Sequence, residues 1–213
     1  MVMRQIPTFA CAYRTGGDYR PRHVDCLMRQ IQRNTTIECR FICLTDCIET
    51  EKWVPSQPLE FNYPGWWSCV ELWKLKGPMI IAGLDTLITG NIDELLNFAC
   101  SLKENDFALL TSPFHANQFV NGIQIWNGDW SWLLDGFDFE KIQAKYRGDE
   151  NYLIESLQKH GANIIAIQDY FPGIYNYKKE FLKNRRIEDP RIIYFHGHPR
   201  PWNVSHLWRK YGQ

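Results

Sequence analysis

The residues best suited to chemistry lie near the end of the chain, in the stretch Phe195-His196-Gly197-His198-Pro199-Arg200-Pro201-Trp202. His196 and His198 are two residues apart and follow a strand-like run, and neutral imidazole is a good ligand for transition metals, including manganese. Arg200 carries a fixed positive charge that can grip a diphosphate through two N–H groups. This spacing predicts a site for a metal ion, an anionic ligand or both.

A second chemical position is Asp85, within Gly83-Leu84-Asp85-Thr86 and directly after an apolar run. Carboxylate oxygens suit hard divalent cations. Two carboxylates at positions i and i+2 of an extended segment point to the same side and could share one ion. Because the i position is Gly83, only half of that arrangement is present.

Two more polar positions follow apolar runs. Tyr13-Arg14-Thr15-Gly16-Gly17-Asp18 contains a glycine pair, which either lets the backbone approach a ligand closely or makes a plain turn. Tyr13 or Arg14 could stack on a base or contact phosphate. Asp46, after the next strand-like run, is a candidate polar contact or helix cap.

The elements that must position these residues alternate along the chain. Amphipathic spacing predicts helices at Pro21–Arg33, Ser68–Leu75 (with Ser68 as N-cap), around Ile92–Ala99 and at Asp149–His160. Apolar runs predict strands at Thr8–Tyr13, Arg40–Leu44, Met79–Ala82, Phe107–Leu110, Ile123–Trp126, Ile164–Ile167 and Arg191–Phe195. The alternation favours an α/β fold, a mostly parallel twisted sheet flanked by helices. In such sheets ligands bind at the carboxyl ends of strands, where the polar positions lie.

Composition limits the function classes. The 213 residues contain 24 Lys+Arg and 24 Asp+Glu, so a wholesale nucleic-acid coat, which would carry a basic excess, is not favoured. No apolar run reaches the roughly 18 residues of a transmembrane helix, and no signal peptide is expected.

Seven cysteines without a CxxC pair favour reduced thiols in a cytoplasmic protein. We expect one domain over residues 1–213. Nine Trp residues are a surplus of the kind that can line a pocket for bases or sugars.

Taken in order, the motifs resemble those of small bacterial and phage glycosyltransferases related to family 8, which have the GT-A fold. The resemblance covers nearly the whole chain, and the motifs that carry it are Ala12-Tyr13-Arg14-Thr15-Gly16-Gly17-Asp18-Tyr19, Cys43-Leu44-Thr45-Asp46, Pro64-Gly65-Trp66-Trp67-Ser68, Glu71-Leu72, Leu84-Asp85-Thr86, Gly148-Asp149, Phe195-His196-Gly197 and Pro199-Arg200-Pro201-Trp202.

The resemblance implies a nucleotide-sugar donor, UDP-linked, with Mn²⁺ or Mg²⁺. Asp85 matches the second Asp of the family's metal-binding DxD motif, and His196 matches its metal-ligand His, with His198 beside it as a further metal candidate. Arg200 matches the diphosphate-binding cation. Asp149 would contact the donor sugar, with Glu150 as a nucleophile or ion-pair stabiliser. The remaining donor-site residues that we expect are Ala12, Tyr13 and Arg14 at the base, Asp46, Asn121-Gly122 beside the sugar, and Gly197.

Four positions depart from the family pattern: Gly83 replaces the first Asp of DxD, Cys47 an acidic residue, Cys69 a Lys and Glu150 a Gln. The leading hypothesis is sugar transfer to a hydroxyl of a glycan, lipid-linked, protein or modified-nucleobase acceptor. A degenerate, non-catalytic nucleotide- or glycan-binding module is the alternative.

Weaker hypotheses rest on other residues. A zinc or redox site would use Cys39, Cys43 and Cys47, although core thiols are favoured. Nucleic-acid binding would use three basic clusters, although a solvated helix face is favoured for them. These clusters are Lys178-Lys179, Lys183–Arg186 and Arg209-Lys210.

The adjacent Trp66 and Trp67 either form a wall of the site or pack in the core.

Overall fold

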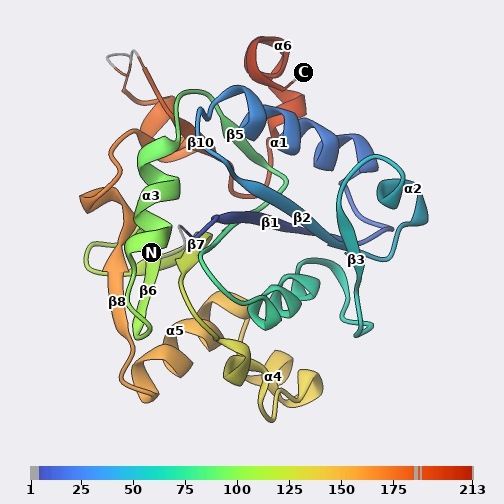
Figure 1. The fold of residues 1–213 in the computed structure, drawn as a ribbon, viewed down its shortest axis with the longest axis vertical. Coiled ribbons are helices and arrows are strands. Elements are labelled where there is room, and N and C mark those ends of the chain that lie inside the picture. Colours follow the sequence, from blue (N-terminus) through green and yellow to red (C-terminus); the bar gives the residue numbers. More distant parts are fainter. Residues whose placement is uncertain (1–4, 185–186, 188, 213) are drawn as a thin grey trace.

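A computed structural model describes residues 5–184, 187 and 189–212. A sheet of seven strands runs through the molecule (Figure 1). Across the sheet the strands follow the order β3 (Ser56–Pro58), β2 (Arg40–Thr45), β1 (Thr8–Tyr13), β4 (Met79–Ala82), β7 (Phe119–Trp126), β6 (Asp106–Thr111) and β8 (Asn163–Ala166).

Most neighbouring strands in this sheet are parallel. β1 pairs in parallel with β2 and β4, β2 with β3, and β6 with β8. β7 runs antiparallel to both of its neighbours, β4 and β6. The predicted α/β class and mostly parallel sheet are therefore confirmed, with one reversed strand in the middle.

A second, three-stranded sheet was not predicted from the sequence. Its order is β5 (Thr86–Ile88), β10 (Ile192–Tyr194) and β9 (Ile174–Asn176). β10 pairs antiparallel with β5, so that Tyr194 lies opposite Thr86. The backbone N–H of Phe195 then donates to the carbonyl of Asp85 across 3.1 Å. This small sheet brings the late His-rich segment to the Asp85 loop.

Helices cover both faces of the large sheet (Figure 1). α1 (Pro21–Arg33) and α3 (Asp93–Ser101) pack with the side chains of one face, and α4 (Phe139–Lys145) and α5 (Asp149–Lys159) pack with those of the other. α2 (Ile48–Glu51) and α6 (Ser205–Tyr211) are short. The other helical segments are the 3₁₀ turns η1 (Gly65–Lys74), η2 (Ser131–Leu134), η3 (Ile167–Asp169) and η5 (Pro201–Asn203) and the π turn η4 (Tyr177–Phe181).

One predicted helix differs from the structure. Ser68 was expected to cap an α-helix, but it lies inside η1, a 3₁₀ helix that begins earlier, at Gly65. Gly65 has a positive φ of 56°, which glycine adopts without strain, and this turn starts the helix one residue after Pro64. The Ser68 hydroxyl instead donates to the Gly65 carbonyl at 2.8 Å.

Strand alternation explains the two-sided core. In β1, Phe9 and Cys11 point to the α1 side, whereas Ala10 points to the η1 side. Both sides are mostly apolar and buried, as expected for a mostly parallel sheet covered by helices. Within the part of the chain that is described, no helix is long and apolar enough to cross a membrane.

Candidate functional site

The polar strand ends meet where the small sheet joins the large one. Asp85, just after β4, forms an ion pair between its Oδ2 and Nη1 of Arg200. The Tyr19 hydroxyl, from the loop after β1, lies near the Asp85 carboxylate and lowers its pKa. Three segments far apart in the sequence thus contribute to one cluster, as the strand-end rule predicts.

Arg200 is held from several sides. Its Cζ lies 5.0 Å from the centre of the Tyr19 ring, a cation–π contact. Its Nε lies 3.5 Å from Oδ2 of Asp18. Only 18% of its side chain is exposed, and 14% of that of Asp85. The guanidinium is therefore fixed in place at the edge of the candidate site.

The three predicted metal ligands do not assemble into a metal centre. Asp85 is engaged by Arg200 and Tyr19. His196 is exposed and packs near Phe114, with ring centres 5.3 Å apart, while His198 points to Asp18 at 3.5 Å. Among residues 5–184, 187 and 189–212, no group of three His, Cys, Asp or Glu side chains could hold a metal ion. The donor set as arranged here does not fit Mn²⁺ or Mg²⁺.

A second cluster contains the two predicted catalytic carboxylates. Asn121, in β7, donates from its side-chain Nδ2 to Oδ2 of Asp149 at 2.8 Å. Its backbone N–H donates to Oε2 of Glu150 at 3.1 Å. Asp149 and Glu150 form the first turn of α5, where the helix dipole favours negative charge. The next residue, Gly122, packs closely against the small sheet, because a Cβ there would lie 3.2 Å from the Tyr194 ring.

All three carboxyl groups of the site have raised pKa values. Burial raises the pKa of Asp149 to about 6, and the negative charge of Glu150 adds to the rise. Burial also raises the pKa of Glu150, although the Asn121 N–H and the nearby His196 act to lower it. Burial likewise raises the pKa of Asp85, although Arg200 acts to lower it. Perturbed carboxyl groups of this kind gather at functional sites.

Cys69, in η1, is partly buried near the carboxylates of both clusters. Burial raises the pKa of its thiol well above the ordinary range, and the charges of Asp149 and Asp85 both raise it further. A neutral thiol therefore lies near both carboxylates, at the position where the resemblance implies a Lys.

The predicted base-binding residues are only partly accessible. Tyr13 is buried in the core, with 4% of its surface exposed, so it does not offer a free ring face, and Ala12 beside it is partly buried. Arg14 donates from Nη1 to Oδ1 of Asn62 at 3.0 Å and lies 3.6 Å from Asp46. Asp46 in turn accepts hydrogen bonds from the N–H and hydroxyl of Thr15, at 2.9 and 3.0 Å. This network shapes the loop after β1.

The two adjacent tryptophans have different environments. Trp67 is buried, with 6% exposure, whereas Trp66 is 64% exposed. The Trp66 indole Nε1 lies 3.9 Å from the place that a Cβ on Gly148 would occupy. Trp66 therefore stands beside the residue that precedes Asp149, and only Trp67 serves the core.

Sequence reasoning missed the role of two residues. Tyr19 was noted only as part of a motif, yet it contacts both Asp85 and Arg200. Lys178 was assigned to a solvated helix face, but it is partly buried and its Nζ donates to the His198 carbonyl at 2.9 Å. That Nζ also lies 4.0 Å from a Cβ position on Gly197. The only signal for either was a place in a polar segment.

The other sequence hypotheses gain no support from the described residues. Cys39, Cys43 and Cys47 carry free thiols, and Cys43 is buried in the core. Lys179 is exposed and lies over the Phe114 ring. Arg185 and Arg186, part of the second basic cluster, lie outside the described residues.

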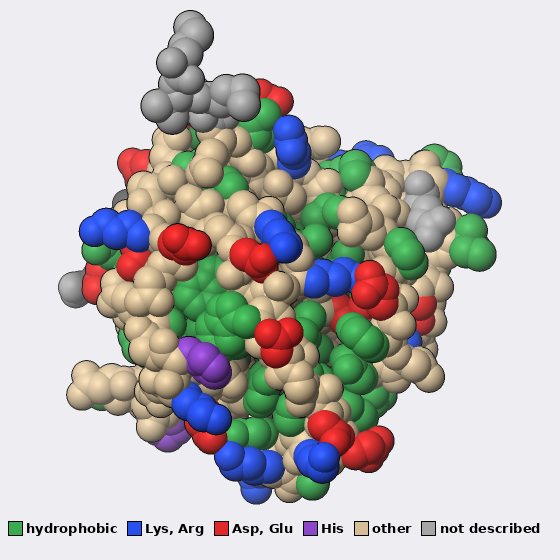
Figure 2. All heavy atoms as spheres, turned by 60° about the horizontal axis from the view of Figure 1, so that its bottom comes forward, with side chains coloured by type: hydrophobic (Ala, Val, Ile, Leu, Met, Phe, Trp, Pro, Cys, Tyr) green, Lys and Arg blue, Asp and Glu red, His purple; other side chains and the backbone are tan. Residues whose placement is uncertain are grey.

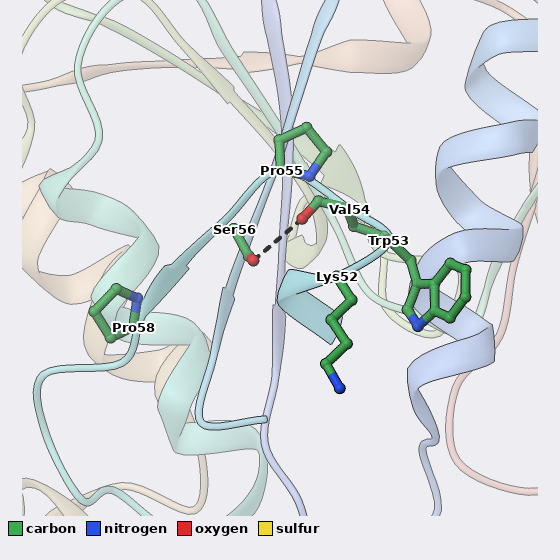
Figure 3. Close-up of a pocket in the computed structure, with 6 residues that line it drawn as sticks. All are labelled: Lys52, Trp53, Val54, Pro55, Ser56 and Pro58. Carbon is green, nitrogen blue, oxygen red and sulfur yellow. Dashed lines mark hydrogen bonds between the residues drawn. The ribbon is translucent and has the colours of Figure 1, made fainter. Parts of the chain in front are cut away.

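Two surface hollows lie away from these clusters. One, of about 440 Å³, is formed by residues on both sides of the start of β3, and Figure 3 shows Lys52 and Trp53 among the residues that line it. The other, of about 370 Å³, is lined by residues of η2, α4 and α5, among them Trp132 and His160. Figure 2 turns the α4–α5 side of the molecule toward the viewer, and hydrophobic side chains reach the surface there among charged ones.

Comparison with known proteins finds similarity at the level of structure. No family profile and no curated protein sequence matches the chain. The glycosyltransferase GlyE of Streptococcus pneumoniae TIGR4 superposes with a TM-score of 0.68 at 14% identity, over 97% of this chain. The chain spans only 60% of the length of GlyE.

Two more glycosyltransferase structures are similar over most of both chains. The galactosyltransferase LgtC, solved with donor and acceptor sugar analogs, gives a TM-score of 0.63 at 11% identity, covering 95% of this chain and 93% of LgtC. Mouse xyloside xylosyltransferase 1 gives 0.53 at 10% identity, covering 91% and 98%. A relation to family 8 stays a prediction. At these identities the comparisons show the fold of this chain, which is that of the GT-A glycosyltransferases.

Proposed function

We propose that this protein is a glycosyltransferase that moves a sugar from a nucleotide-sugar donor, UDP-linked, to a hydroxyl acceptor. The observation that carries the proposal is the Asn121–Asp149–Glu150 cluster, which lies with the Asp85–Arg200 pair at the same end of the paired strands β4 and β7. Carboxylates can orient a sugar, and a fixed guanidinium at the same edge can stabilise the charge that develops on a leaving diphosphate.

In this proposal the leaving group is stabilised by Arg200. Charge builds on the diphosphate as its bond to the sugar breaks, and a positive group already in place stabilises that charge without reorganising. Arg200 is held on the Tyr19 ring and beside Asp85, so it meets this requirement.

The donor sugar is oriented by the second cluster. Asp149 is fixed by Asn121, and at neutral pH it is mostly ionised because its pKa is about 6. It would accept hydrogen bonds from sugar hydroxyl groups. Glu150, fixed by the Asn121 backbone, would place a carboxylate near the anomeric carbon, as a nucleophile or as a stabiliser of positive charge.

The acceptor would approach along Trp66. Its exposed indole lies beside Gly148, one residue from Asp149. A tryptophan with one apolar face in contact with water and a polar N–H is suited to stacking against a sugar ring. We therefore propose a glycan acceptor ahead of the lipid-linked, protein and nucleobase classes.

The first test is donor binding followed by turnover. UDP, GDP and ADP are compared in thermal unfolding of the whole chain, since a ligand at 100 times its Kd stabilises the native state by about 2.7 kcal/mol. A shift specific for UDP, together with sugar release or transfer from one member of a UDP-sugar panel, is expected. UDP binding with no turnover of any donor would instead support the non-catalytic module.

A variant separates binding from catalysis. Asp149→Asn is expected to keep UDP binding, because Asp149 is assigned to the sugar, and to lose most of the turnover. Wild-type turnover in Asp149→Asn would overturn the role of Asp149. Asp135→Asn, an exposed carboxylate, is the matched control.

A further inference from the structure

The carboxylate expected to hold a metal ion is already neutralised by the protein. Arg200 Nη1 pairs with Oδ2 of Asp85, and the Tyr19 ring holds the Arg200 guanidinium from another side. A divalent cation would have to displace a guanidinium that is itself held by a ring and by Asp18. The Asp85 carboxylate is therefore a poor starting point for a metal centre.

The second carboxylate of such a centre has no place here. A Cβ added to Gly83 would lie 2.7 Å from Oδ1 of Asp85, closer than such atoms approach in proteins. A side chain at position 83 would therefore require Asp85 to turn. Gly83 also removes one negative charge, so the pair of Asp85 with Arg200 is neutral without any ion.

Two side-chain cations flank the loop that follows β10. Arg200 lies at one end, and its Nε makes no hydrogen bond within the described residues. Lys178 lies against the middle of the loop, with its Nζ 2.9 Å from the His198 carbonyl and 4.0 Å from the Cβ position of Gly197. Gly197 has no side chain to cover either cation. Charged N–H donors of this kind are strong partners for phosphate oxygens.

We propose that the donor diphosphate binds to Arg200 and Lys178 without a divalent cation, and that Asp85 is a positioning residue for Arg200. This inference rests on the proposed function, because it concerns the donor of that reaction. It removes the metal-ligand role from Asp85 and His196, which the resemblance marks for it, and from His198, which the spacing of the two histidines suggested.

The test measures UDP affinity by isothermal titration with purified chain, in EDTA and in saturating Mn²⁺ or Mg²⁺. The variants are Arg200→Ala, Lys178→Ala and Asp85→Asn. The matched control is Arg191→Ala, because Arg191 also combines an ion pair, with Glu94, and a cation–π contact, 4.9 Å from the Phe171 ring centre. Thermal unfolding of each variant checks that it is folded.

We expect UDP to bind wild type with a Kd that changes less than about threefold between EDTA and Mn²⁺. Arg200→Ala is expected to weaken binding about tenfold or more in both buffers, because charge-assisted hydrogen bonds to phosphate are lost. Lys178→Ala is expected to weaken it less, and Arg191→Ala not at all. Asp85→Asn, which keeps an acceptor for Arg200, is expected to bind UDP in EDTA as well as wild type does.

Two results would overturn the inference. One is a gain of tenfold or more in UDP affinity with Mn²⁺ that Asp85→Asn abolishes, since this would make Asp85 a metal ligand. The other is normal UDP affinity in Arg200→Ala. A failure of UDP, GDP and ADP to bind wild type in any buffer is distinguishable from both, because it would overturn the proposed function and this inference with it.

Discussion

Removing the charge of Asp149 should stabilise the fold while it impairs the reaction. Burial raises the pKa of this carboxyl group from the ordinary value of about 4 to about 6. One pKa unit corresponds to about 1.4 kcal/mol, so keeping Asp149 ionised in the folded protein costs on the order of 1–3 kcal/mol at neutral pH. Asp149→Asn removes this cost and keeps an oxygen that can accept from Asn121.

The pH dependence follows from the sign of this shift. Between the unfolded pKa near 4 and the folded pKa near 6, the folded state binds more protons than the unfolded state, so its stability falls as pH rises. Above pH 6 the full cost is present. The stability difference between Asp149→Asn and wild type should be near zero at about pH 4 and largest at pH 7 to 8.

Thermal unfolding of both proteins across this pH range is the assay. For a chain of this length about 1 kcal/mol shifts Tm by roughly 2–4 °C, so Asp149→Asn should melt several degrees above wild type at pH 7.5. The control Asp135→Asn should show no such pH-dependent gain. A Tm for Asp149→Asn that is lower than that of wild type at pH 7.5, or a gain that does not change with pH, would refute the reasoning about buried charge.

Three further predictions concern the site and its support. Trp66→Ala should raise KM for glycan acceptors about tenfold and leave UDP affinity unchanged. The control is Trp53→Ala, at another exposed tryptophan, which should change neither quantity. An altered UDP affinity in Trp66→Ala would argue against an acceptor role for Trp66. Gly122→Val should destabilise the protein by about 1–3 kcal/mol, because its Cβ would crowd the Tyr194 ring at 3.2 Å. Urea unfolding measures this, and an unchanged unfolding midpoint would contradict the packing. Hydrogen bonds from Thr and Asn side chains lower the pKa of Asp93 in spite of its burial. Asp93→Asn should therefore reduce the free energy of unfolding by about 1 kcal/mol at pH 7, and this loss should shrink as pH falls below 4. A loss of stability that is constant from pH 7 to 3 would contradict the prediction.

Sequence reasoning performed best where the signal is local. The bounds of β1, β4 and α1 were predicted to the residue, because each is a single apolar or amphipathic run ended by a turn signal. The rule that ligands bind at strand ends also predicts from the sequence that Asp85 and Arg200 lie at one edge. Their direct ion pair was not predicted, because it depends on the pairing of β5 with β10 across about a hundred residues of chain.

The amino-acid sequence by itself determined the α/β class, the order of the motifs and the absence of one carboxylate at Gly83, since these follow from residue types and short-range periodicity. Only the tertiary structure decided that Trp66 faces water while Trp67 enters the core, and that Lys178 turns toward the loop after β10. It also decided that Arg200 neutralises Asp85. The physical reason is that side-chain contacts between distant segments depend on strand pairing and packing, which no local pattern encodes.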